Sequence, residues 1–264
     1  RSPDQTRWIA PDLRGACYAA LAGEVLDGGW PGSSAAGEQP KFTACVADAA
    51  GGGRPVIVKF SGDVHDPAQA RRADLLVAES IAARVLAGAG IAAAATGILY
   101  HDHRCFLEST RFDRAGAAGR IGLVSLQALD SAFYGDLNTP WTAAARRLLR
   151  DGLLGGDDAE RLCVAWWFGR FIGNSDMHYG NVSFHLSPAA PLALAPIYDM
   201  TPMALHPRAD GSLPGVLPDV PVAPPEQADF RARAAVLARE YQSRIASDAR
   251  LSDDFRAICG AAIH

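Results

Sequence analysis

The sequence is poor in cysteine, and its cysteines follow no metal-binding or disulfide pattern. It has five, widely spaced, and no two of them form a C-x-x-C pair: Cys17, Cys45, Cys105, Cys163 and Cys259. An odd, scattered set argues against a disulfide framework and against a structural zinc site. We therefore expect a reducing, cytoplasmic environment.

Long apolar runs and a strong excess of charge are also missing. Arg, Gly and Glu interrupt the alanine-rich stretches, so no segment reaches membrane-spanning length, and no secretory signal pattern opens the chain. The formal net charge is only −4, which argues against direct binding of nucleic acid by this segment. The chain begins with Arg1, as expected of a fragment or a processed product.

The first part of the chain has the pattern of a small mixed lobe. With 264 residues and 49% hydrophobic content, the chain can form one domain of two lobes. Apolar spacing, β-branched runs and glycine clusters predict a helix over 7–26, a loop over 27–41, strands over 42–47 and 55–60, a helix over 69–87, and strands over 98–100 and 105–109. We expect the strands to form two hairpins of one antiparallel sheet.

The second part is predicted to be mainly helical. Helices are expected over 141–150, 157–172, 227–247 and 251–263, with short strands over 182–186 and 192–195. Asp157 or Asp158 is predicted to cap the second of these helices, and the proline-rich residues 206–225 are predicted to form a loop or lid. The chain is therefore expected to be an α+β protein with a β-rich lobe over 1–114 and a helical lobe over 115–264.

The strongest chemical signal is Asp176 followed by four residues and Asn181, with Asp199 downstream. Phosphoryl transfer from ATP requires a base for the acceptor hydroxyl and oxygen ligands for Mg²⁺, and D-x-x-x-x-N is the spacing of a kinase catalytic loop. Short motifs of this kind also occur by chance, and Asn174-Ser175-Asp176 is equally compatible with a simple helix-ending turn. The interpretation therefore depends on further residues.

Two upstream residues favour the kinase interpretation. Lys59 lies near the end of a β-branched strand, and Glu79 lies on the following helix. Kinases use such a lysine for the nucleotide phosphates and such a glutamate as its partner. Taken singly, Lys59 fits an edge-strand charge and Glu79 a solvated helix residue. Their order with Asp176 and the later residues favours a site.

Other features are weaker. The Gly/Ser-rich residues 32–41 can bring backbone N–H groups close to phosphates, although such a turn usually only connects elements. His101 and His103 lack a third ligand nearby and are expected at an exposed hairpin tip rather than around a metal. His178 is expected to shape its loop by hydrogen bonding if Asp176 is the base.

With these residues in place, the sequence resembles the HipA family of serine/threonine kinases, the toxins of type II toxin–antitoxin systems. Four blocks carry the resemblance, over residues 34–41, 58–60, 108–114 and 171–181 with 194–199. The resemblance implies a two-lobed protein-kinase-like fold. It also implies that Asp176 is the catalytic base, and that Asn181 and Asp199 hold Mg²⁺.

The resemblance further implies an ATP site and a self-modification site. The ATP-binding residues would be Lys59, Glu79, Glu108, Thr110, Gly37, His178 and Asn181, with Glu108 and Thr110 at the hinge near the adenine. Family members phosphorylate a serine in the glycine-rich loop, and Ser34 occupies that place here beside Ser33. A phosphate there would add negative charge next to the ATP phosphates and oppose nucleotide binding.

The implied partners are ATP, a protein substrate and an antitoxin that binds DNA. By family analogy, the substrate would be an aminoacyl-tRNA synthetase. Full HipA proteins have an N-terminal subdomain, but only residues 1–32 precede the serine loop here. In the YjjJ-like branch a DNA-binding module takes that place. Residues 206–225 match no part of the family that we can assign.

Two other functions remain open at this point. One is a pseudokinase that binds ATP and works as a regulatory module with a DNA-binding domain. The other is a metal-dependent hydrolase or nuclease that uses Asp176, His178 and Asp199. The presence of every expected catalytic residue argues against the first, and the acidic net charge argues modestly against the second.

Overall fold

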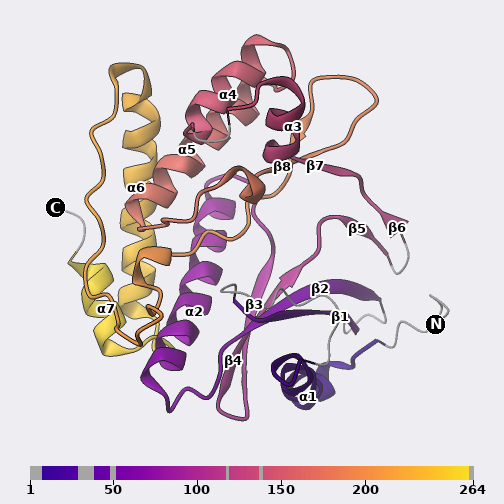
Figure 1. Ribbon diagram of the computed structural model, residues 1–264, viewed down its shortest axis with the longest axis vertical. Coiled ribbons are helices and arrows are strands. Elements are labelled where there is room, and N and C mark those ends of the chain that lie inside the picture. Colours follow the sequence, from indigo (N-terminus) through magenta and orange to yellow (C-terminus); the bar gives the residue numbers. More distant parts are fainter. Residues whose placement is uncertain (1–7, 29–38, 48–51, 117–118, 137–138, 262–264) are drawn as a thin grey trace.

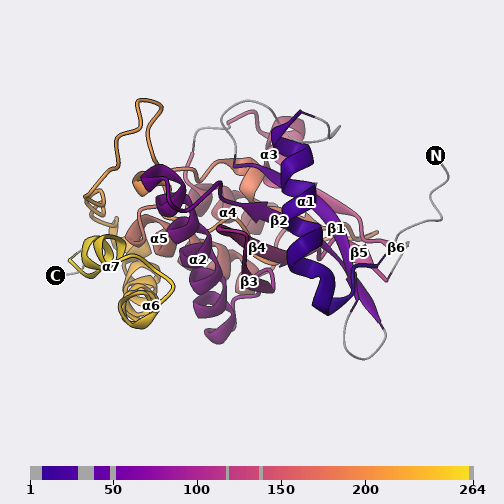
Figure 2. The same cartoon turned by 90° about the horizontal axis from the view of Figure 1, so that it is seen from below.

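The computed structural model combines an antiparallel sheet with a larger group of helices (Figures 1 and 2). It describes residues 8–28, 39–47, 52–116, 119–136 and 139–261. Strands dominate the first part of the chain and helices the second, which confirms the predicted α+β class. Among the described residues, no helix combines the length and apolar character needed to cross a bilayer.

The sheet has four strands in the order β1-β2-β4-β3, all antiparallel. They are β1 (Lys41–Ala47), β2 (Gly53–Phe60), β3 (Thr96–His101) and β4 (Arg104–Thr110). Alternation along β2 puts Val56, Val58 and Phe60 on one face, where all three are fully buried. The intervening Ile57 and Lys59 therefore face the other way. Both predicted hairpins are confirmed.

Helix α1 (Arg14–Leu26) covers the first face of the sheet, as Figure 2 shows. Its Tyr18, Ala22 and Val25 pack with apolar side chains of β1, β2 and β4. The helix was predicted to start at residue 7, which is wrong: helical structure begins with a 3-10 turn over Pro11–Leu13. Ile9 instead pairs with Val46 of β1, because its main chain extends the edge of the sheet.

Helix α2 (Pro67–Gly88) covers the other face of the sheet and lies between it and the helical region (Figure 1). Its N-cap is Asp66, whose side chain accepts the N–H of Gln69. The helix is buried almost all round, because it packs on β4 on one side and on α6 (Ala228–Ser247) on the other. The prediction of a helix over 69–87 is confirmed.

The helical region contains the other predicted helices. They are α4 (Trp141–Arg150), α5 (Gly156–Phe171), α6 and α7 (Asp253–Gly260), with a 3-10 turn over Pro225–Gln227 before α6. The capping prediction for α5 is wrong. Gly155 is its N-cap, and the Asp158 side chain instead accepts the N–H of Leu194 at 2.8 Å.

A second small sheet connects the two parts of the chain. Its strands, in the order β7-β8-β9, are β7 (Leu123–Ser125), β8 (Ser183–His185) and β9 (Ala193–Leu194). The two predicted strands near residues 182–195 are thus confirmed. The sequence prediction missed β7, the short hairpin of β5 (Arg114–Ala115) and β6 (Gly119–Arg120), and helix α3 (Leu126–Phe133). Each of these is too short for a periodic pattern to stand out.

The proline-rich segment has no regular structure. Residues 206–224, all within the described part, form neither helix nor strand, which confirms the predicted loop. A 3-10 turn over Met203–Leu205 leads into it, and a main-chain hydrogen bond from Ala204 N–H to Gly173 O ties that turn to the end of α5.

Candidate active site

Two adjoining cavities form one cleft between the sheet and the helical region. The inner cavity, about 240 Å³, is lined by Ile57, Ser109 and Thr110 of the sheet, the residues 111–113 that follow β4, and Tyr198. The outer cavity, about 210 Å³, is lined by Asp176, His178, Asn181, Thr201, Met203 and His206. Lys41, Lys59 and Asp199 line both cavities, so they lie where the two meet.

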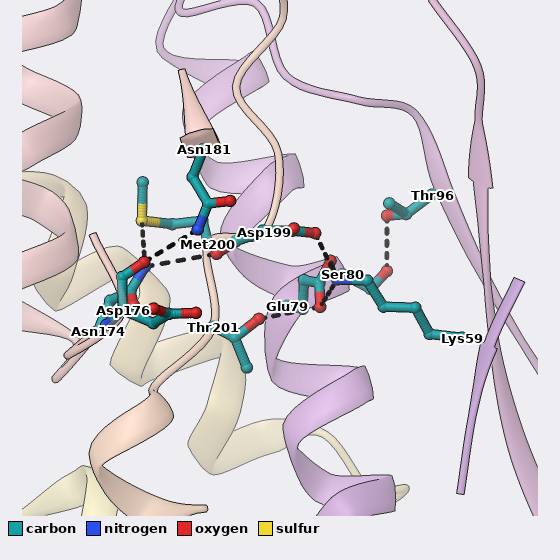
Figure 3. A network of polar contacts seen from close by, with 10 residues as sticks. All are labelled: Lys59, Glu79, Ser80, Thr96, Asn174, Asp176, Asn181, Asp199, Met200 and Thr201. Atoms are coloured by element: carbon teal, nitrogen blue, oxygen red, sulfur yellow. Dashed lines mark hydrogen bonds and ion pairs between the residues drawn. The ribbon is translucent and has the colours of Figure 1, made fainter. Parts of the chain in front are cut away.

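Lys59 is held between two carboxylates at this meeting point (Figure 3). Its Nζ is 2.7 and 2.9 Å from the two carboxylate oxygens of Glu79, and 2.5 Å from Oδ1 of Asp199. Thr201 donates its hydroxyl to Glu79 at 2.9 Å. The predicted pair of Lys59 and Glu79 is therefore formed, and Asp199 joins it.

The charges of this group are strongly coupled. Burial by itself lowers the pKa of Lys59, but the carboxylates of Asp199 and Glu79 outweigh it, so the pKa is raised. Burial also raises the pKa of Glu79 above its usual range, against the opposing effect of Lys59. For Asp199, the attraction of Lys59 overcomes burial and lowers the pKa. One ammonium thus faces two carboxylates, and the lowered pKa of Asp199 keeps its carboxylate ionised where the two cavities meet.

Asp199 has an unusual backbone conformation. Its φ is +55°, which is uncommon for a residue other than glycine and typical of functional sites. The preceding Ile197 forms a bridge with Ala93, and Tyr198 donates its hydroxyl to Gly180 O at 2.7 Å. Asp199 is therefore fixed both to the loop before β3 and to the segment that carries Asp176.

The segment around Asp176 begins as the end of α5. Gly173 closes the helix with φ of +76°, a conformation that glycine adopts without strain. The buried Asn174 then accepts the N–H of Asp176 at 3.0 Å and donates to the main-chain oxygen of Asp199 at 3.4 Å. The helix-ending turn and the site are thus the same feature, because this turn sets the position of Asp176.

Asn181 and His178 complete the segment. Asn181 lies in a 3-10 turn over Tyr179–Asn181, and its side-chain amide donates to the main-chain oxygen of Asp176 at 2.9 Å. His178 Nδ1 accepts the N–H of Gly180 at 3.0 Å, while its Nε2 lies 3.8 Å from Asp176 Oδ1. His178 therefore shapes the loop and lies beside the carboxylate, which is more than half exposed to the cleft at 57%.

Glu108 is not brought to the cleft. Its main chain is paired with Val58 on one side and Gly97 on the other. Its side chain lies on the α1 face of the sheet, where it accepts the Tyr18 hydroxyl at 2.6 Å and pairs with Arg54. The segment that meets the inner cavity starts one residue later, at Ser109, and it includes Thr110.

Several predicted residues lie outside the cleft or outside the described residues. Gly37, Ser33 and Ser34 fall in the range 29–38, which the structure does not describe. His101 and His103 lie at the β3–β4 turn, where the His103 ring lies against that of His65, with 4.7 Å between ring centroids and a tilt of 46°. In the described ranges, no group of three or more His, Cys, Asp and Glu side chains is arranged to hold a metal.

Asp199 and Asn181 still fit a magnesium ion of the kind that phosphates help to bind. Mg²⁺ takes one or two protein oxygens, keeps several waters, and completes its shell with phosphate oxygens. One carboxylate and one amide oxygen among the residues that line the outer cavity satisfy that requirement. The same residues are too few for a site built from protein ligands alone.

Sequence reasoning missed several residues of the cleft. Thr201, Met203 and His206 line the outer cavity, and Asn174 fixes both Asp176 and Asp199. Asn174 carried a usable signal, because asparagine directly after a helix-ending glycine often hydrogen-bonds its own backbone. The other three follow Asp199 in an irregular segment, where no periodic pattern could identify them.

The cleft has the arrangement of a protein-kinase-like protein. A strand lysine is paired with a helix glutamate, and an Asp-x-x-x-x-Asn segment and a downstream Asp line the same cleft. The fold agrees. It matches a chain of the Shewanella oneidensis MR-1 toxin–antitoxin complex of HipA, HipB and operator DNA, with a TM-score of 0.60, 20% identity, and coverage of 92% of this chain and 67% of that one. It also matches the Helicobacter pylori proinflammatory kinase CtkA, with a TM-score of 0.56, 13% identity, and coverage of 86% and 88%.

Sequence comparison gives the family. The model of the HipA-like C-terminal domain matches residues 33–257, so the chain belongs to the HipA family. It is 41% identical over 242 residues to Toxin YjjJ of Escherichia coli (strain K12), a match that covers 91% of this chain and 54% of that protein. The chain thus spans about half the length of this relative, and the resemblance to the YjjJ-like branch is confirmed.

Proposed function

We propose that this chain is the catalytic part of an ATP-dependent serine/threonine protein kinase. The observation that carries the proposal is the position of Lys59, held by Glu79 and Asp199 where the two cavities meet. A nucleotide base in the inner cavity would place its phosphates at these shared residues. The acceptor hydroxyl would then enter through the outer cavity, beside Asp176.

The residues divide the reaction between them. Asp176 accepts the proton of the acceptor hydroxyl. The hydroxyl oxygen forms a bond to the γ-phosphorus of ATP, and the bond between that phosphorus and the oxygen of the leaving ADP breaks. Lys59 orients the phosphates, and Glu79 orients Lys59. Asn181 and Asp199 would hold Mg²⁺, which supplies positive charge against the phosphates when bound.

The contacts of Lys59 suit this role. Its three acceptor oxygens come from Glu79 and Asp199, so its contact with Asp199 is available for exchange with phosphate. Asp199 would then hold Mg²⁺ together with Asn181, while Glu79 would keep Lys59 in place. The buried contact between Lys59 and Glu79 would thus remain, and phosphate would replace the more exposed contact between Lys59 and Asp199.

We further propose that the kinase acts as a toxin that phosphorylates itself on Ser33 or Ser34 and is restrained by an antitoxin. The support is family membership and the name of the relative, Toxin YjjJ. The HipA structure that this fold resembles also contains HipB and operator DNA, which makes a DNA-binding antitoxin the natural partner to test. An aminoacyl-tRNA synthetase is the substrate that we would test first.

The test is transfer of the labelled γ-phosphate of ATP to the chain in the presence of Mg²⁺. Wild type should label itself, with the label mapping to Ser33 or Ser34. Asp176→Asn should lose labelling by at least about a thousandfold, because the base is removed while the shape is kept. The control is Asp157→Asn, which removes one exposed carboxylate at the start of α5 and should label like wild type.

The same material separates the alternatives. Thermal stabilisation by Mg²⁺ and ATP without any transfer, to itself or to a cell extract, would support a pseudokinase. Cleavage of nucleic acid that requires Mg²⁺ but no ATP would support a nuclease. Labelling that persists in Asp176→Asn would show that Asp176 is not the base.

A further inference from the structure

Helix α2 carries two buried charges that the proposed chemistry does not use. Arg71 is 3% exposed and Asp74 is 4% exposed, and both precede Glu79 on the same helix. A buried charge is unfavourable unless partners compensate it, so the partners of these two residues are informative. In both cases the partners come from the far end of the chain.

Arg71 holds two distant segments at once. Its Nη1 donates to Pro214 O at 2.8 Å and to Leu205 O at 3.4 Å, and its Nη2 pairs with Asp254 Oδ2 at 2.6 Å. The guanidinium also lies over the ring of Phe255, 5.6 Å from its centroid. One side chain of α2 therefore joins the proline-rich segment to the first turn of α7.

Asp74 adds a second attachment one turn later. Its Oδ1 accepts the Ser252 N–H at 2.9 Å, and its Oδ2 accepts the Ser252 hydroxyl at 2.6 Å. Ser252 is the N-cap of α7 and also accepts the N–H of Phe255. Asp74 thus fixes the residue that starts the C-terminal helix, and both of its carboxylate oxygens are used.

These contacts fix the register of α2 against the helical region. Arg72 contributes too, since its Nη1 lies 3.1 Å from Nε2 of His206. A helix rises about 1.5 Å per residue and transmits displacement along its axis as a stiff body. A shift of its N-terminal half would therefore move Glu79 relative to Lys59, which is anchored separately in β2.

We infer that Arg71 and Asp74 are positioning residues that hold Glu79 against Lys59, with residues 205–214 and 252–254 as their support. The inference rests on the proposed function and assigns a role to the proline-rich segment: one of its main-chain oxygens, that of Pro214, is a ligand for Arg71. The C-terminal helix α7 thereby controls the geometry of the ATP site without touching it.

The test is a double-mutant cycle between Arg71→Gln and Glu79→Gln, measured as kcat for self-labelling and KM for ATP. Each single change should lower kcat by about tenfold or more and leave KM within about threefold, because every other residue that lines the inner cavity with Glu79 is kept. The double variant should be no worse than the more damaged single variant, since both changes disturb one contact. Independent, multiplying losses would overturn the inference.

Two controls separate positioning from general loss of stability. Leu148→Ala opens a cavity in the core at α4, far along the chain from this network, and should keep its kcat below its melting temperature. Arg71→Lys keeps the charge and should recover part of the lost kcat. A loss of kcat in Leu148→Ala equal to that in Arg71→Gln would show that Arg71 acts through stability alone.

The contact between Glu79 and Lys59 can also be tested by a measurement that needs no phosphate transfer, so that it does not depend on the proposed function. The chain has only two lysines, so the acetylated fraction of Lys59 after treatment with acetic anhydride can be assigned and measured by mass spectrometry. Arg71→Gln and Glu79→Gln should each raise Lys59 acetylation by about fivefold or more, and the double variant no further. If wild type transfers no phosphate but this pattern holds, the function fails and the inference stands. If Arg71→Gln leaves acetylation unchanged, the inference fails.

Discussion

Replacing Lys59 by methionine should lower the free energy of unfolding, because the carboxylate of Glu79 then stays buried without its partner. Lys59 and Glu79 are both largely buried, with side chains 12% and 6% exposed. Removal of one partner of a buried pair costs about 3–5 kcal/mol, because the other charge stays buried without compensation. Glu79→Gln should cost less, since Lys59 keeps Asp199 at 2.5 Å.

The double variant Lys59→Met/Glu79→Gln provides the internal check. With both charges gone, the glutamine can still accept the Thr201 hydroxyl that Glu79 accepts now. Its free energy of unfolding should lie above that of Lys59→Met, because only Asp199, the more exposed of the two carboxylates, is then left without the lysine. The expected order of stability is wild type first, the double variant next, and Lys59→Met last.

The deficit of Lys59→Met should also depend on pH in a defined direction. Burial raises the pKa of Glu79 even with Lys59 present, so without it the pKa should rise further. A carboxyl whose folded pKa lies above its unfolded value binds protons on folding, and its destabilising effect fades as pH falls through the folded pKa. The deficit should therefore shrink from pH 8 towards pH 5, and this trend should be weaker in the double variant, where Asp199 alone has lost the lysine.

The assay is urea unfolding followed by tryptophan fluorescence, since Trp141 and Trp167 are buried in the helical core. Nucleotide is left out, so that ligand binding does not contribute. A double variant no more stable than Lys59→Met, or a deficit that stays constant with pH, would refute the account of this buried pair.

Three further predictions concern residues around the cleft. Asn174→Ala should lower kcat for self-labelling by about tenfold or more and leave ATP binding nearly unchanged, because it frees the N–H of Asp176. Gly173→Ala should cost at least about 1–2 kcal/mol in urea unfolding, since its φ is +76° and a Cβ would lie 2.4 Å from Leu217. Glu108→Gln should lower the melting temperature without changing KM for ATP; a raised KM would place its side chain at the adenine after all.

The main features of the fold could be predicted because they depend on local patterns. The β-branched residues around Lys59 specify a strand, and the apolar spacing before Glu79 specifies a buried helix. Asp176 and Asn181 could be singled out because D-x-x-x-x-N is the spacing of a kinase catalytic loop, and both side chains line the outer cavity. In each case the information lies within a few consecutive residues.

The prediction was weakest where the outcome depends on distant segments. Alternation along β4 shows that Glu108 and its neighbours face opposite ways, but only the position of α1 decides which face becomes the cleft. Thr201 and His206 reach the cavity because the irregular segment after Asp199 folds back on α2. The partners of Arg71, more than 130 positions away in sequence, follow from the same packing.

The central proposal is that this chain transfers phosphate from ATP to a protein, with Asp176 as the base. The most direct measurement in cells is a comparison of phosphorylated proteins after brief expression of wild type and of Asp176→Asn at equal levels. The account predicts serine or threonine sites that appear only with wild type, one of them dominant, together with growth inhibition that the variant lacks. Identical phosphorylation in the two samples, with growth inhibition retained by Asp176→Asn, would contradict it.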